Sequence, residues 1–139
     1  MLMLDTNMLS EMMRPKPEGK IADWIVRQPS DDLFTAAVCQ AEILSGIAIL
    51  PSGRRRAALE AAAYSMFETD FARRVLPFDA EAATAYAELF AARRTAGRPS
   101  GTIDLMLGGI ARVRGASVVT RNVADFEGLG LRIVNPWDE

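Results

Sequence analysis

The feature that most constrains the fold stands at the start of the chain, where the apolar run Leu2–Leu4 meets the polar triplet Asp5–Asn7. A short apolar run that ends so abruptly is typical of a buried parallel strand. The carboxyl end of that strand would deliver Asp5 to the edge where open α/β sheets bind ligands. The next segment, Asn7–Met13, has Glu11 as its only charge and predicts a helix, so Asp5 would lie beside free backbone N–H groups. On this segment alone, a simple helix N-cap explains Asp5 better than a functional site does.

Strands and helices are predicted to alternate along the rest of the chain. The expected strands are 2–4, 33–35, 75–78, 117–120 and 131–134, and the expected helices lie at 7–13, around 21–25, at 38–47, at 54–71, after Asp79 and after Thr102. This alternation indicates an α/β fold with a central, mainly parallel sheet and right-handed crossovers. A chain of 139 residues, half of them hydrophobic, suits one domain over residues 1–139 and leaves no room for two.

Three local patterns give sharper expectations. Asp79 and Thr102 are good N-caps for the helices that follow them. The helix after Asp79 is expected to present one apolar face, made of Ala83, Tyr86, Ala87 and Phe90. The pair Gly108–Gly109 weakens its helix by about 1 kcal/mol per glycine, a cost that is compensated if another backbone must come close.

The absence of histidine excludes several classes of enzyme. Without imidazole there is no Ser-His-Asp or Cys-His nucleophile pair, no histidine acid–base cleavage of phosphodiesters and no histidine-held zinc. Cys39 is the single cysteine, so the chain has neither an intramolecular disulfide nor a cysteine cage for a metal. An enzyme built from this chain must therefore use carboxylates, which hold hard cations through oxygen ligands.

The charge pattern and the termini bear on partners and location. The net charge is only −2, and fourteen arginines against two lysines favour bidentate contacts with phosphate or carboxylate. The run Arg54–Arg56 could bind RNA or could be a solvated helix end. No segment is long and apolar enough to cross a membrane, and the N-terminus lacks a secretion signal, so we expect a cytoplasmic protein without membrane contact.

Three acidic residues stand alone in apolar segments that are predicted to be buried: Asp5, Glu42 and Asp104. Burying an ionised carboxylate without a partner costs several kcal/mol, and nothing basic lies in the same segments. The three could be separate caps or hydrogen-bonded core acids. They could instead share one site, where mutual repulsion raises their pKa values until a divalent cation neutralises them. We prefer the shared site, because Glu42 falls inside an apolar helix where no cap explains it.

The order of the motifs resembles that of the PIN-domain toxins of the VapC family over essentially the whole chain. The motifs are Leu4-Asp5-Thr6-Asn7, Ala41-Glu42, Ile103-Asp104, Val119-Thr120-Arg121-Asn122 with Asp125-Phe126, and the closing Asn135-Pro136-Trp137. The resemblance implies a PIN-like α/β/α fold and an endoribonuclease that depends on Mg²⁺ or Mn²⁺. It also implies a homodimer and a small cognate antitoxin, VapB-like, which folds over the active-site groove and alone contacts promoter DNA.

The resemblance also assigns roles to individual residues. The acids that match the family's catalytic metal site are Asp5, Glu42 and Asp104. The polar residues expected around them are Thr6, Asn7, Thr120 and Asp125. Many relatives carry a fourth acid where this chain has Asn122, whose amide can orient a water or ligate but brings no charge, which puts a second metal in doubt. Arg121, beside the expected site, is the candidate for binding the RNA substrate.

Two other functions remain open from the sequence. A metal-dependent phosphatase could use Asp5 as its nucleophile, but such sites usually have a second acid where this chain has Asn7. Alternatively, the chain could be a non-catalytic, partner-regulated subunit of a DNA-binding complex in which the acids are structural. Metal-dependent cleavage of RNA separates the ribonuclease from both.

Overall fold

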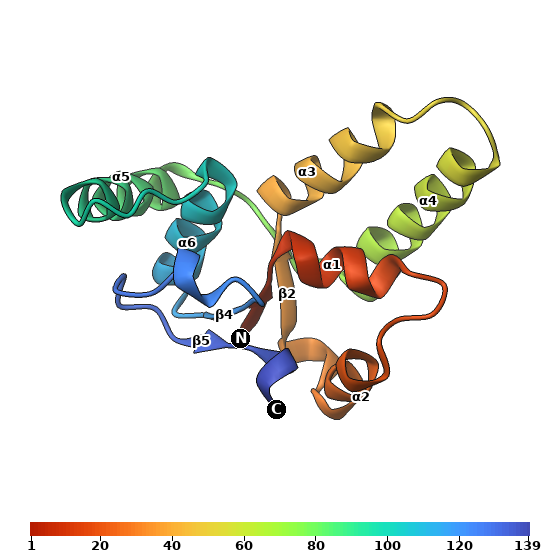
Figure 1. Cartoon of the computed structure of the whole chain (residues 1–139), viewed down its shortest axis with the longest axis horizontal. Coiled ribbons are helices and arrows are strands. Elements are labelled where there is room, and N and C mark those ends of the chain that lie inside the picture. Colours follow the sequence, from red (N-terminus) through yellow and green to blue (C-terminus); the bar gives the residue numbers. More distant parts are fainter.

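A computed structural model describes residues 1–139 and shows helices arranged around a five-stranded sheet (Figure 1). In sheet order the strands are β3 (Val75–Leu76), β2 (Leu33–Ala36), β1 (Leu2–Leu4), β4 (Ser117–Val119) and β5 (Ile133–Val134). Every neighbouring pair is parallel. The predicted α/β fold with a parallel sheet is therefore confirmed, although β3 and β5 are shorter than the sequence suggested.

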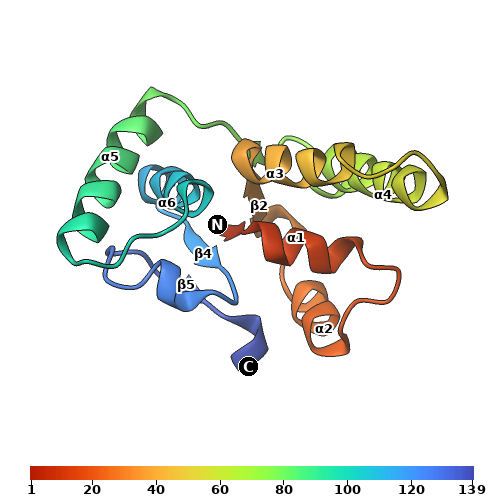
Figure 2. The same ribbon diagram turned by 45° about the horizontal axis from the view of Figure 1, so that its top comes forward.

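Six α-helices connect these strands: α1 (Thr6–Met13), α2 (Gly19–Arg27), α3 (Ala37–Ala48), α4 (Arg54–Ser65), α5 (Ala80–Thr95) and α6 (Thr102–Arg114). Figure 1 shows the α3–α4 pair and the α5–α6 pair diverging on either side of the sheet's carboxyl-terminal edge, with α1 starting between them. Figure 2, in which this edge comes forward, shows the same arrangement. None of the helices has the length and apolar character needed to cross a lipid bilayer.

The core is centred on β1, whose Met3 and Leu4 are fully buried. The expected helix over 54–71 is α4 followed by a π-helical turn, Met66–Asp70, and the side chains of Met66 and Phe71 are buried in the core. The wider turn lets the chain leave the helix and still keep both residues on the buried side.

The contact between α5 and α6 confirms the role predicted for Gly108–Gly109. A Cβ on Gly109 would lie 2.8 Å from the carbonyl oxygen of Ala82 and 3.1 Å from the backbone nitrogen of Tyr86. The backbones of the two helices therefore touch at Gly109. The N-cap prediction for Asp79 is also confirmed, because its carboxylate accepts a hydrogen bond from the backbone N–H of Ala82 at 2.9 Å.

The face predicted for α5 is wrong. The helix buries Ala82, Ala85, Leu89 and Arg93, whereas most of the expected face, Ala83, Tyr86, Ala87 and Phe90, points away from the core. Phe90 is 45 % exposed and its ring lies 6.1 Å from that of Tyr86. Alanines occur on both sides of the helix, so spacing did not distinguish the two faces, and a buried arginine occupies the side that packs.

Two further expectations are corrected. Helix α3 buries only Cys39, Ile43 and Ile47, so Glu42 is exposed and not enclosed by apolar residues. Thr102 does not cap α6: it lies inside the helix, whose N-cap position is Gly101 without a side-chain cap. Glu42 borders a surface cavity and not the interior, and α6 begins one residue earlier than a Thr102 cap would require.

Candidate functional site

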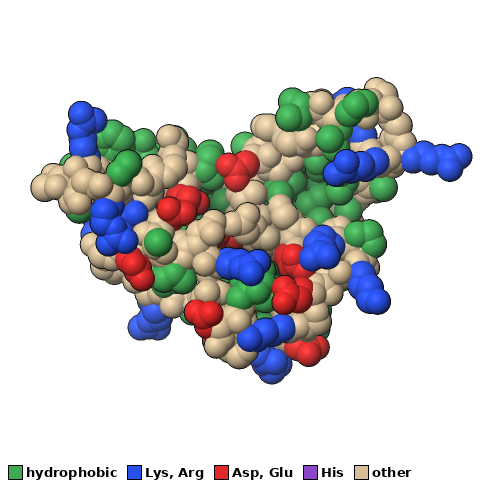
Figure 3. Space-filling view, viewed as in Figure 1, with side chains coloured by type: hydrophobic (Ala, Val, Ile, Leu, Met, Phe, Trp, Pro, Cys, Tyr) green, Lys and Arg blue, Asp and Glu red, His purple; other side chains and the backbone are tan.

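A cavity of about 290 Å³ opens at the carboxyl-terminal edge of the sheet. It is lined by Asp5, Thr6, Asn7, Glu42, Gly101, Thr102, Ile103, Asp104 and Asn122. The three lone acids therefore meet at one cavity, although they come from the end of β1, from α3 and from the first turn of α6. Figure 3 shows acidic side chains on both sides of the hollow between α3 and α6.

The sheet order explains why Asp5 stands at the centre of this edge. The chain leaves β1 toward β2 on one side, while β4 lies on the other side, so the strand order reverses at β1. The helices that leave such a switch point diverge and open a crevice beyond the strand ends. Asp5 lies at the end of β1, and Thr120 follows β4 directly beside it.

Asp5 is 3 % exposed and its two carboxylate oxygens have different partners. Oδ1 accepts a hydrogen bond from the backbone N–H of Met8 at 3.0 Å, and Oδ2 accepts one from the Thr120 hydroxyl at 2.6 Å. Asp5 is thus a helix N-cap as well as a lining residue of the cavity. The Thr120 oxygen also accepts from the backbone N–H of Asn122 at 2.9 Å, which ties the chain after β4 to the carboxylate.

Crowding of carboxylates shifts the acid–base properties of the cavity. Burial raises the pKa of Asp5, the negative charge of Glu42 adds to that rise, and the hydrogen bonds from Thr120 and Met8 oppose it. The pKa of Asp104 rises to about 6, first because of burial and then because of the charges of Asp125, Asp5 and Glu42. The carboxylates of Asp5, Glu42 and Asp104 therefore lie close enough for each charge to oppose the ionisation of its neighbours.

The structure separates the two candidates for the fourth position. Asn122 lines the cavity, whereas Asp125 does not. Asp125 lies in a short 3-10 turn, Val123–Asp125, close enough for its charge to raise the pKa of Asp104. Asn122 is therefore placed to contact a ligand, and Asp125 acts on the site through Asp104.

Two residues that hold this turn were missed by the sequence analysis. Arg93 of α5 is buried and donates hydrogen bonds to the carbonyl oxygens of Glu127 and Ala124, both at 3.0 Å. Ser100 donates to the carbonyl oxygen of Asp125 at 2.8 Å. The sequence suggested only that Arg93 complements the end of its helix, and nothing local pointed to a contact with a loop thirty residues away.

The oxygen donors around the cavity fit a hydrated hard cation. No three acidic side chains are grouped closely enough to hold one ion among them. Mg²⁺, however, is commonly held by one or two carboxylates and keeps several of its waters, so donors spread over the walls suit it. Thr6 lines this cavity, and its hydroxyl oxygen is buried without a hydrogen-bond partner in the structure.

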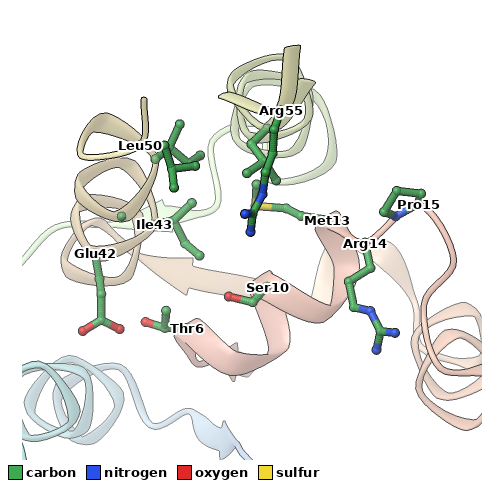
Figure 4. Close-up of a pocket in the computed structure, with 12 residues that line it drawn as sticks. Thr6, Ser10, Met13, Arg14, Pro15, Glu42, Ile43, Leu50 and Arg55 are labelled. Carbon is green, nitrogen blue, oxygen red and sulfur yellow. The ribbon is translucent and has the colours of Figure 1, made fainter. Parts of the chain in front are cut away.

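A second, more apolar groove of about 390 Å³ adjoins the acidic cavity. Thr6 and Glu42 line both, and Figure 4 shows them at one end of the groove, with Arg55 reaching in from α4 between α3 and α1. The groove runs on past Ile43 to Leu50. A ligand in this groove would thus reach the acidic cavity.

Arg121 lies beside the acidic cavity, as its place in the sequence suggested, and does not line it. Its guanidinium lies over the ring of Trp137, with 5.1 Å between its central carbon and the ring centroid. Both residues line a neighbouring cavity of about 400 Å³, which shares Asn7 with the acidic one. Arg121 is therefore next to the site but not in it.

Known proteins resemble this chain over almost its whole length, both in sequence and in structure. Residues 2–128 match the PIN domain family. The plasmid stability protein StbB of Pseudomonas syringae pv. tomato is 39 % identical over 138 residues, and the VapC ribonuclease Y4jK of Sinorhizobium fredii is 36 % identical over 138 residues; each alignment covers 99 % of both chains. The solved structure of FitAB bound to an IR36 DNA fragment contains a chain that superimposes with a TM-score of 0.90 at 30 % identity, covering 99 % of this chain and 96 % of that one.

Proposed function

The chain belongs to the PIN domain family, and on that premise we propose that it is the toxin of a type II toxin–antitoxin system and hydrolyses RNA as an endoribonuclease. The observation that carries the proposal is the convergence of Asp5, Glu42 and Asp104 on one cavity at the switch point of the sheet. PIN-domain nucleases depend on divalent metal ions, and the cavity offers the oxygen ligands that such ions require. We assign Mg²⁺ or Mn²⁺ to this site.

Asp5 and Asp104 would hold the ion, with Glu42 and the Asn122 amide completing its surroundings. A bound ion would supply Lewis-acid chemistry at this site, by lowering the pKa of a water and stabilising negative charge on the phosphodiester. The raised pKa values of Asp5 and Asp104 favour this role, because a cation offsets both their burial, which is the first cause of the rise, and the repulsion from neighbouring carboxylates. The chain offers no histidine that could replace the ion in phosphodiester cleavage.

The surrounding residues orient the Asp5 carboxylate and the attacking water, and one of them accepts a proton. The hydroxyl of Thr120 donates a hydrogen bond to the Asp5 carboxylate. This bond fixes the rotation of the carboxylate, so that Asp5 keeps one orientation relative to Glu42 and Asp104. Glu42 is exposed on the α3 wall, where its carboxylate can accept a proton from the attacking water. Asn122 can orient that water through its amide without adding charge. Attack by water leaves a 5′-phosphate and a 3′-hydroxyl and needs no 2′-hydroxyl.

The test is cleavage of a labelled single-stranded RNA by the chain free of antitoxin. We expect cleavage with Mg²⁺ or Mn²⁺, none with excess chelator, and 5′-phosphate ends on the products. Millimolar metal should also raise the melting temperature, since a ligand that binds only the folded state stabilises it. Cleavage that persists in chelator, or products with 2′,3′-cyclic ends, would contradict the proposal; metal-dependent release of phosphate from small esters alone would favour the phosphatase.

A cognate antitoxin is the protein partner, and we place its docking segment in the apolar groove beside the acidic cavity. The groove is lined by apolar side chains of α3, α4 and the loop between them, including Ile47 of α3 and Leu50 of the loop. Glu42 at its end would attract a basic side chain of the antitoxin. Leu50→Glu should weaken antitoxin binding by about 10-fold or more, because a charge would be buried at the interface. RNA cleavage by the variant alone should be unchanged. Calorimetric titration that gives equal affinities would place the antitoxin elsewhere.

We also propose that the chain forms a homodimer and meets promoter DNA only through the antitoxin. The aromatic pair on α5, the half-buried Tyr86 and the exposed Phe90, is an apolar surface that a second copy would cover. The net charge of −2 gives the toxin itself little attraction for DNA. Light scattering tests the homodimer: the measured mass should be twice the chain mass of 15.2 kDa.

A further inference from the structure

We propose that the cavity beside the acidic site binds one unpaired base of the RNA, stacked on the platform formed by Arg121 and Trp137. This subsite rests on the proposed function, because it selects the nucleotide next to the phosphate that is cleaved. The cavity is lined by Asn7, Ser10, Glu11, Arg14, Arg121 and Trp137. Asn7 also lines the acidic cavity, so a base held here belongs to a nucleotide adjoining the reacting phosphate.

Trp137 is fixed in place before any ligand arrives. Its indole N–H donates to the Glu18 carboxylate at 2.9 Å, and its backbone N–H donates to the Asn135 side chain at 3.0 Å. Its carbonyl oxygen accepts from the Lys20 ammonium at 2.7 Å. These bonds join the C-terminal turn to α2 and hold the ring at a set angle beside the cavity. A ring that is already immobilised loses little conformational entropy on binding.

Arg121 has no bond that would occupy its donors. It makes no hydrogen bond or ion pair in the structure; its guanidinium lies over the face of Trp137, and its charge helps to lower the pKa of Glu11 on the same cavity. Arg14, on the same cavity, is instead paired with Glu11 at 2.9 Å. The guanidinium of Arg121 therefore presents an exposed plane and five free N–H groups next to a site that processes phosphodiesters.

A guanidinium on an aromatic face is a surface suited to an unpaired base. Proteins that recognise single-stranded RNA stack bases on aromatic rings and on arginine planes, while arginine donors reach the phosphates. The cavity, at about 400 Å³, lies within the range of small-ligand sites. A peptide suits it less, because most of its lining is polar or charged and the apolar groove lies elsewhere.

The test measures binding of an unstructured RNA of about 12 nucleotides in chelator, where no cleavage occurs. Trp24, the other tryptophan, is 3 % exposed, so quenching by RNA reports on Trp137. We expect quenching by RNA in the wild-type protein. Trp137→Leu should abolish the quenching and raise the Kd by about 5- to 150-fold, the range of one stacked base. Arg121→Gln, which leaves the ring in place, should raise the Kd and reduce the salt slope by about one.

A set of RNAs that each carry one abasic nucleotide separates a binding role from a structural one. At one position the abasic RNA should bind wild type and Trp137→Leu equally, because the stacked base is missing from both complexes. Two variants are the matched controls: Tyr64→Leu, at an exposed aromatic on α4, and Arg132→Gln, at the amino-terminal edge of the sheet. Neither should change the Kd for RNA.

The outcomes that overturn the subsite can be told apart. If Trp137→Leu binds all RNAs like wild type while metal-dependent cleavage is intact, the subsite is wrong and the ribonuclease stands. A penalty that persists with every abasic RNA makes Trp137 structural. Quenching by the antitoxin and not by RNA makes the cavity a protein-binding site. If the wild-type protein neither binds nor cleaves RNA with metal present, the proposed function fails together with the subsite.

Discussion

Asp104→Asn should slow metal-dependent RNA cleavage by roughly 100-fold or more and yet make the metal-free protein more stable at pH 7.5. The first effect follows from losing a ligand and a charge at the cavity that Asp104 shares with Asp5 and Glu42. The second follows from the pKa of Asp104, which lies at about 6 because burial and three neighbouring carboxylates oppose its ionisation. An amide of the same shape carries none of that repulsion.

The pH dependence fixes the sign of the stability effect. A carboxyl whose pKa is higher in the folded than in the unfolded state stabilises the fold when it is protonated. This stabilisation is lost as the pH rises through the pKa of the folded state. The wild-type protein should therefore lose metal-free stability between about pH 4 and pH 7, relative to the variant. A shift of about two pKa units, discounted for partial exposure, corresponds to about 1–2 kcal/mol above pH 7.

Thermal melts of both proteins in chelator, from pH 4 to pH 8, measure this difference. The curves should approach one another at pH 4 and separate by about 2–6 °C at pH 8. Asp23→Asn, an exposed acid on α2, is the control and should run parallel to wild type. Lower stability of Asp104→Asn at every pH would mean that the carboxylate has a structural role, and undiminished cleavage would remove it from the site.

The sequence placed Asp5 correctly in the fold for a physical reason. An apolar run that ends in an acid predicted a buried parallel strand with Asp5 at its carboxyl end, and β1 has this position in the sheet. That segment alone favoured a helix N-cap, and the prediction of a shared site came from comparing three lone acids in different segments. The three acids reach one cavity because the strand order reverses at β1. The sequence predicted a parallel sheet but not the order of its strands. Sheet order depends on contacts between segments far apart in the chain, and no local pattern records them.

The environment of Glu42 could not be predicted in the same way. Helix α3 is apolar on most sides, yet Leu44 and Ile49 are exposed, with Ile49 at 84 %. An apolar helix that borders a groove for a partner has the same sequence pattern as one buried in a core. Glu42 does line the cavity shared with Asp5 and Asp104, although the reason first given for expecting it there, burial of Glu42, is wrong.

Gly109→Ala should destabilise the protein by about 2–3 kcal/mol, the largest effect that we expect from adding one methyl group to this chain. The new Cβ would lie 2.8 Å from the carbonyl oxygen of Ala82 and 3.1 Å from the backbone nitrogen of Tyr86. Both neighbours are backbone atoms of α5, so the helices must separate, because no flexible side chain can yield. Separation would also loosen Arg93 of α5, which holds the turn that carries Asp125.

Gly46→Ala is the matched control, since Gly46 also lies inside a helix, α3, and a Cβ there meets nothing within 4 Å. Replacing it should stabilise the protein by about 0.5–1 kcal/mol, because alanine is the better helix former and no contact opposes it. Chemical unfolding of the two variants should therefore give free energies of unfolding that move in opposite directions from wild type. If both variants gained stability, α5 would be free to move away from α6, and the close backbone contact at Gly109 would not be what holds the two helices together.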